Sequence, residues 1–132
     1  MSLALIFAAA ATTANPIIGR WYTPGAKAVV DIAACGKQLC GTIISAAPFP
    51  ATGAPPRDSR NPDPALRNRS IVGVRLLSGF IPDGSGWKSG TIYNPTNGKT
   101  YRSELAFGGD GRLKVSGCVA IFCQTQIWRR AR

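Results

Sequence analysis

The densest group of reactive side chains lies in one short segment, where carboxylate, amide and guanidinium groups crowd into twelve residues. Its members are Asp58, Arg60, Asn61, Asp63, Arg67 and Arg69. Arg67 and Arg69 could clamp a carboxylate or a phosphate through paired hydrogen bonds. Alternatively, Asp58 and Asp63 pair with these arginines and fix the segment, because a long loop needs polar anchoring. The sequence favours anchoring over ligand binding, and both hold if the segment is a lid.

Aromatic side chains are the second set of candidate ligand contacts. Tyr93 and Tyr101 flank a turn, Asn94-Pro95-Thr96-Asn97-Gly98, and should lie at one end of the fold. Together with Trp128 they could line a ligand cavity. The alternative is that they fill the interior, as aromatic residues do in most small β-barrels.

The absence of histidine excludes most catalytic sites. No Ser-His-Asp or Cys-His arrangement, no two-histidine metal site and no imidazole base can form. Acid–base chemistry would fall to six carboxylates, and nothing in their spacing supports a hydrolase. These are Asp31, Asp58, Asp63, Asp83, Glu104 and Asp110. We therefore predict a protein that is not an enzyme and that uses neither a metal nor another cofactor.

Residues 1–14 differ in kind from the rest of the chain. They carry no charge, contain an apolar run from Leu3 to Ala11, and end in the small residues Thr12 and Ala14. This pattern is typical of a secretory signal, although the basic start is missing and the segment is short. We interpret it as a truncated signal, followed by a single domain over residues 15–132 in the periplasm or outside the cell. No apolar run is long enough to span a membrane.

The four cysteines form two sequence pairs, Cys35/Cys40 and Cys118/Cys123, each with four intervening residues. An even number in a short exported chain indicates disulfides. Zinc sites and redox dithiols usually have two intervening residues, so both are less favoured. We predict that each pair bridges its own hairpin and holds its loop. Residues 119–122 are apolar, and we expect them to be buried; the alternative is an apolar lip at a ligand or partner site.

The net charge of +10 first suggests nucleic acid as a partner. The basic residues, however, are scattered, and the only run is Arg129-Arg130-x-Arg132. For an exported protein, anionic lipid headgroups or acidic envelope polymers are better candidates. We therefore expect no nucleic-acid partner.

Eight apolar or alternating stretches predict the strands that position these residues. They are Ile18–Tyr22, Lys27–Ala34, Leu39–Ala46, Ile71–Ser78, Trp87–Tyr93, Thr100–Phe107, Arg112–Cys118 and Cys123–Arg129. Short connections such as the Asn97-Gly98 turn make sequential strands antiparallel neighbours. Eight of them favour an all-β, up-and-down barrel without open edges. The exception is the long loop 47–70, where Asp63-Pro64 predicts one short helical turn.

Several local patterns are those of one known family. They are Gly19-x-Trp21, Ile32-Ala-Ala-Cys35-Gly, Leu39-Cys40-Gly41, Asp58-x-x-Asn61-Pro62-Asp63-Pro64-x-Leu66-Arg67, Arg69-x-Ile71-x-Gly73, Gly90-x-Ile92-Tyr93-Asn94-Pro95-x-Asn97-Gly98-Lys99-x-Tyr101, Leu113-Lys114-Val115-x-Gly117-Cys118 and Thr125-Gln126-x-Trp128-x-Arg130. From about Pro16 to Arg130 the chain resembles an exported bacterial family called domain of unknown function 2147. The resemblance implies a lipocalin-type barrel. It supplies no assigned activity, so no catalytic residue is carried over.

Two functional hypotheses follow. The first is an exported, non-enzymatic barrel that binds a small apolar or amphiphilic ligand in its interior, in a cavity under loop 47–70 lined by aromatic residues. The second is a cell-envelope interaction protein with a filled core and clustered arginines at one end. Such a protein would be a hydrolase inhibitor or a module that binds an anionic polymer or lipid. We expect a monomer in either case.

Overall fold

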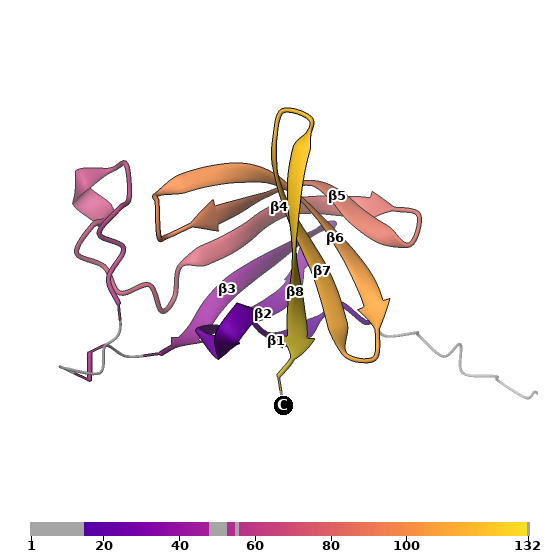
Figure 1. Cartoon of the computed structure of the whole chain (residues 1–132), viewed down its shortest axis with the longest axis horizontal. Helices are drawn as coiled ribbons and strands as arrows, with labels where there is room; N and C mark the ends of the chain where they lie inside the picture. The colour runs from indigo at the N-terminus through magenta and orange to yellow at the C-terminus, as the bar shows by residue number, and fades with distance from the viewer. Residues whose placement is uncertain (1–14, 48–52, 55, 132) are drawn as a thin grey trace, which may run out of the picture.

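In the computed structural model, eight antiparallel strands close into one barrel in sequence order (Figure 1). The structure describes residues 15–47, 53–54 and 56–131, so the predicted signal segment 1–14 lies outside the described residues. The strands are β1 (Gly19–Tyr22), β2 (Ala28–Cys35), β3 (Gln38–Ala46), β4 (Arg75–Asp83), β5 (Gly86–Asn94), β6 (Lys99–Gly109), β7 (Arg112–Val119) and β8 (Phe122–Arg130). The predicted eight-stranded, up-and-down barrel is therefore confirmed.

One strand begins later than the sequence predicts. Residues 71–74 form a turn before β4 rather than its first part, because Gly73 has a φ of +99° and Val74 donates its N–H to the carbonyl of Ile71. β4 then runs past Gly79, where the sequence suggested a break, to Asp83. Pro82 is accommodated opposite Trp87 next to the turn at the end of the strand.

Two short 3-10 turns complete the secondary structure of the described residues, namely η1 (Pro24–Ala26) and η2 (Pro64–Leu66). η2 is the predicted helical turn of the long loop. The Asp63 side chain accepts a hydrogen bond from the backbone N–H of Ala65 at 3.0 Å, and Pro64 occupies the first helical position. Among the residues described, no helix has the length and apolar character needed to cross a membrane.

The centre of the barrel is a packed core rather than a hollow one. Trp21, Leu77, Phe80 and Leu113 have no exposed surface, and Trp128 is almost fully buried. Glycine is required where these side chains approach a neighbouring strand. A Cβ atom built on Gly90 would lie 2.4 Å from the Phe80 ring. The part of the interior around these residues has no room for a ligand, because their side chains fill it.

The seam that closes the barrel is short. β1 and β8 share two residue pairs, Trp21 with Arg130 and Tyr22 with Arg129, whereas β7 and β8 share eight. Arg130 reinforces the seam, since its guanidinium group stacks 4.0 Å from the centre of the Trp21 ring and donates to the carbonyl of Ile18. Arg129 and Arg130, two members of the basic C-terminal run, therefore help to close the barrel.

The expectation that residues 119–122 are buried is wrong. Val119, Ile121 and Phe122 are 62%, 87% and 76% exposed. The ladder between β6 and β7 ends at the pair Arg102–Cys118, so residues 119–122 are not paired with β6 and their side chains are left uncovered. Figure 1 shows the β7–β8 hairpin rising past the other strands. Cysteines bond as predicted within each hairpin, Cys35 to Cys40 and Cys118 to Cys123.

Candidate ligand-binding site

The predicted polar cluster is organised around one fully buried carboxylate, Asp58. Its two oxygens accept hydrogen bonds from the Tyr93 hydroxyl at 2.5 Å, the Asn61 amide at 2.9 Å and Nε of Arg69 at 2.9 Å. A second guanidinium nitrogen of Arg69 lies 2.9 Å from the same carboxylate. Asn61 and Arg69 belong to the long loop, whereas Tyr93 belongs to β5. The carboxylate therefore fastens the loop to the barrel.

The surroundings of Asp58 fix its protonation state. Burial by itself raises the pKa of the Asp58 carboxyl, but hydrogen bonds from Tyr93, Asn61 and Arg69 outweigh it, and the pKa falls below its ordinary value of 3.8. Burial, followed by the hydrogen bond to Asp58, raises the pKa of Tyr93 to about 12. At neutral pH the carboxylate is therefore ionised and the phenol protonated, as the hydrogen bond between them requires.

The other loop residues of the cluster bond to the loop itself. Nε of Arg67 donates to the Asn61 carbonyl at 2.8 Å, and the Asn61 side-chain oxygen accepts from the backbone N–H of Asp63 at 2.8 Å. Because Arg69 engages Asp58 and Arg67 engages Asn61, the two guanidinium groups do not face one common point. These contacts favour the interpretation as a structural anchor over a clamp for an anion.

The three aromatic candidates do not form one site. Tyr93 pairs with Thr100 in the ladder between β5 and β6, so Tyr93 and Tyr101 lie on opposite faces of the sheet. Tyr93 contacts Asp58, whereas the Tyr101 hydroxyl accepts from the Asn97 amide at 2.8 Å. Trp128 lies in the core, where its indole N–H donates to the Gln126 side chain at 3.0 Å.

Sequence reasoning missed a row of small and polar residues across the inner face of β5 to β8. The cross-strand register places Gly90, Ser103, Gly117 and Gln124 side by side. Ser103 is 1% exposed, and in the part of the chain that the structure describes its hydroxyl oxygen has no hydrogen-bond partner. A buried hydroxyl without a partner is rare, because its desolvation is not compensated. The signal for this row is the pair Gly90 and Gly117, which become neighbours of the inward-facing Ser103 once the strands are paired.

On β6 and β7, this row marks the change from the packed core to more exposed inner-face residues. On one side of it, Leu105 and Val115 are buried in the core. On the other side Tyr101 is half-buried and Phe122 is exposed, and Gln124 within the row is exposed although it shares the face of Trp128. We call this region, made of Ile92, Tyr101, Ser103, Gly117, Gln124 and Phe122, the open end.

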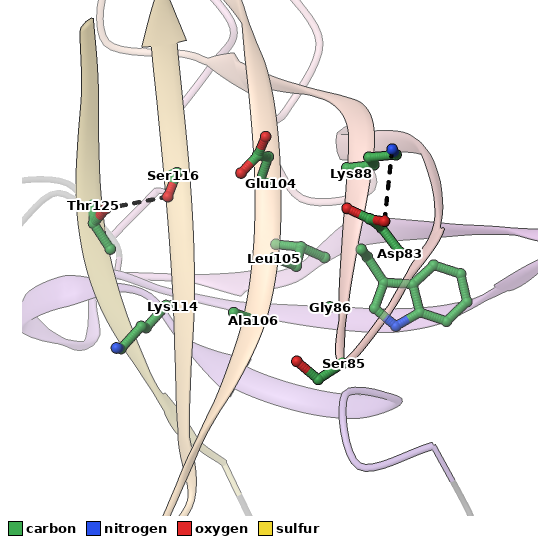
Figure 2. Close-up of a pocket in the computed structure, with 11 residues that line it drawn as sticks. Asp83, Ser85, Gly86, Lys88, Glu104, Leu105, Ala106, Lys114, Ser116 and Thr125 are labelled. Carbon is green, nitrogen blue, oxygen red and sulfur yellow. Dashed lines mark hydrogen bonds and ion pairs between the residues drawn. The ribbon is translucent and has the colours of Figure 1, made fainter.

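Two cavities lie elsewhere on the molecule. One of about 280 Å³ lies over β5 to β8 and is lined by polar side chains together with apolar ones such as Leu105 and Ala106 (Figure 2). There the hydroxyls of Ser116 and Thr125 lie 3.1 Å apart, and Lys88 Nζ lies 3.6 Å from an Asp83 oxygen, so these groups partner one another. The other, of about 430 Å³, lies between η1 and β8. Neither is the predicted cavity under loop 47–70, and in the described residues no group of three or more Cys, Asp or Glu side chains could hold a metal ion.

Comparison with known proteins identifies the architecture. A family model described as "Uncharacterized protein conserved in bacteria (DUF2147)" matches residues 19–130. The chain is also similar to a solved structure, that of protein HP1028 from the human pathogen Helicobacter pylori, which is described as belonging to the lipocalin family. That similarity has a TM-score of 0.74 and 28% sequence identity, and it covers 87% of this chain and 82% of that one. No curated protein matches the sequence.

Proposed function

We propose that this chain, which belongs to the bacterial family DUF2147, is an exported, non-enzymatic protein that binds a small amphiphilic ligand at the open end of its lipocalin-like barrel. The observation that carries the proposal is the buried, unpartnered hydroxyl of Ser103 on the inner face. A polar group of a ligand would satisfy it and recover the free energy lost by burying it. Two disulfides support export to the periplasm or beyond.

The residues around Ser103 narrow the chemistry of the ligand. Neither Tyr101–Phe107 in β6 nor the facing parts of β7 and β8 place a charged side chain on the inner face. A charged ligand group would therefore be desolvated there without a counter-ion, which is unfavourable. The ligand's polar group is accordingly a neutral hydroxyl, ester or amide that contacts Ser103 and Gln124. Its apolar part lies along Ile92, Tyr101 and Phe122.

The geometry gives less support to an interaction module that uses the loop arginines. That hypothesis needs Arg67 and Arg69 available to a partner at one end of the barrel. Both donate to groups of this chain instead, Arg69 to Asp58 and Arg67 to Asn61. The loop is therefore better suited to hold β5 in place than to bind an anion.

Binding of a fluorescent apolar probe tests the proposal. N-phenyl-1-naphthylamine should bind saturably and be displaced by monolaurin, whose head group is neutral, at least tenfold more effectively than by laurate. Ser103→Leu should reduce probe affinity at least tenfold because it fills the open end. Ser116→Leu is the matched control, since Ser116 lies on the opposite face and pairs with Thr125.

The folded state of each variant is checked by near-ultraviolet circular dichroism. Should Ser103→Leu not fold, Gly117→Val provides a second way to fill the site, because a Cβ atom at Gly117 makes only ordinary contacts of 3.7 and 3.9 Å. Absence of saturable probe binding by the wild-type protein would overturn the proposal. So would equal binding by the filled and wild-type proteins.

A further inference from the structure

The tip of the β7–β8 hairpin, Val119-Ala120-Ile121-Phe122, is an apolar surface of which the proposed ligand site accounts only for Phe122. Three of its side chains are between 62% and 87% exposed. Exposed apolar residues usually occur singly on a protein surface, whereas a contiguous group indicates a contact with a partner or a membrane. In Figure 1 the tip is the farthest point of the hairpin from the closed part of the barrel.

The tip is held in its exposed shape by two constraints. The disulfide between Cys118 and Cys123 joins directly paired residues at the base of the turn, with their Cα atoms 4.1 Å apart. The Arg102 guanidinium reaches across from β6 and donates to the Ala120 carbonyl at 2.6 Å. The turn therefore cannot readily fold back to hide Ile121 and Phe122. A preformed apolar tip loses little conformational entropy when it inserts into another phase.

The charge distribution around the tip indicates what it contacts. The fourteen residues from Val115 to Trp128 carry no charge, in a chain that has 22 charged side chains. Arg102 lies at the base of the tip and bonds to the Ala120 carbonyl, whereas Lys114 and Arg129, which border the uncharged segment, lie toward the other end of the hairpin. The carboxylate nearest in register, Glu104, is opposite Ser116 and thus farther from the tip than Arg102. An uncharged apolar tip with the Arg102 guanidinium at its base, on a chain of net charge +10, complements an anionic lipid surface.

We propose that this hairpin tip docks the protein on anionic phospholipid membranes. Ile121 and Phe122 enter the boundary between head groups and acyl chains, while Arg102 and the net charge of +10 attract the anionic head groups. The interaction is peripheral and reversible. It goes beyond the ligand-binding function, because Ile121 and Arg102 are not part of the open end and Phe122 alone is shared with it.

Flotation with lipid vesicles tests this docking. Wild-type protein should float with vesicles of phosphatidylcholine containing 30% phosphatidylglycerol, and much less with pure phosphatidylcholine. Ile121→Ser/Phe122→Ser should lower the partition coefficient at least tenfold. Phe107→Ser/Ile81→Ser is the matched control, because these residues are also apolar and exposed but lie away from the tip. Binding should weaken as salt is raised, because the Arg102 contribution is screened.

A tryptophan placed at the tip reports insertion directly. Phe122→Trp should show a blue shift of its emission when anionic vesicles are added, beyond any change in the wild-type protein, whose tryptophans are the buried Trp21 and Trp128 and the half-buried Trp87. No flotation with anionic vesicles would overturn the proposal. So would flotation that the tip double variant leaves unchanged, or tip-dependent self-association in sedimentation velocity, which would assign the tip to a second copy. Ser103→Leu should float normally, so failure of ligand binding and failure of docking are distinguishable.

Discussion

Replacing Asp58 by asparagine isolates the contact that fastens the long loop to β5. Asparagine preserves the shape of the side chain but removes its charge. It also places an amide nitrogen among three groups, from Tyr93, Asn61 and Arg69, that can only donate in the present arrangement. At least one buried donor then has no acceptor. The variant therefore tests both the charge and the acceptor capacity of Asp58.

The expected loss can be worked from these contacts. Hydrogen bonds to a charged group contribute about 1.5–3 kcal/mol and neutral ones about 0.5–1.5 kcal/mol, so each donor loses about 1 kcal/mol. The contribution of Arg69 is smaller, because its side chain is 40% exposed and regains water. An unpaired donor adds about 1 kcal/mol more. The sum is a loss of about 3 kcal/mol, which corresponds to a decrease in Tm of about 12 °C for a domain of this size.

Thermal unfolding followed by circular dichroism measures this loss, with Asp83→Asn as the control. Asp83 also faces a cation, Lys88, at 3.6 Å, but both side chains are about half exposed, so we expect a change in Tm of less than about 2 °C. The loss at Asp58 should depend on pH. Because the folded pKa lies below the unfolded value of 3.8, the carboxylate stabilises fully above about pH 5. This stabilisation disappears as pH falls through the folded pKa, so the two proteins should converge in acid.

Equal Tm values for wild type and Asp58→Asn at pH 7 would refute this reasoning. A difference that persists unchanged at pH 2 would also count against it. In that case the loss would come from packing rather than from the ionised carboxylate.

Three further predictions follow from single contacts. Gly90→Ala should lower the free energy of unfolding by about 2 kcal/mol in urea titrations, because its Cβ would meet the Phe80 ring at 2.4 Å, whereas Gly117→Ala should change it little. Cys118→Ser/Cys123→Ser should lower the free energy of unfolding by about 2 kcal/mol in the same assay. Cys35→Ser/Cys40→Ser should lower it by about as much, because both disulfides close loops with the same sequence separation of 5. Unequal losses would show that the entropy of loop closure is not the main contribution. In absorbance titrations at 295 nm one tyrosine should ionise near pH 12, and Tyr93→Phe should abolish that step. The stability that Tyr93 supplies is present below pH 10 and is lost as pH rises through about 12.

The barrel was predictable because strand alternation and turn residues are local signals. The alternation of Tyr101, Ser103 and Leu105 with charged neighbours in β6 correctly separates the two faces, and Asn97-Gly98 correctly marks a hairpin. Burial at the β7–β8 tip was mispredicted for a geometric reason. Whether Ile121 is covered depends on where the pairing of β7 with β6 ends, and the sequence of the hairpin does not contain that information.

The candidate site was predictable only in part, because its partners are distant in sequence. Asp58 and Arg69 lie close in sequence and bond to each other, as the anchoring interpretation expects, but for Tyr93, 35 residues farther along, the sequence offers only a ligand cavity or the barrel interior. Cross-strand register decides which side of β5 Tyr93 faces. Ser103 was overlooked for the same reason, since its neighbours Gly90 and Gly117 become adjacent only when three strands are aligned.

The anchor and the open end are connected through β5. Tyr93 faces the loop and is held by Asp58, while the adjacent residue Ile92 faces inward and lies near Gly117 and opposite Tyr101. Releasing Tyr93 frees the end of β5 to move, and the wall of the open end moves with it. A structural role for Asp58 is therefore compatible with ligand binding. On this argument Asp58→Asn should weaken probe binding without touching the ligand. Tyr93→Phe should weaken it at least as much, because Asn61 and Arg69 hold the carboxylate only to the loop and Tyr93 is its contact with β5.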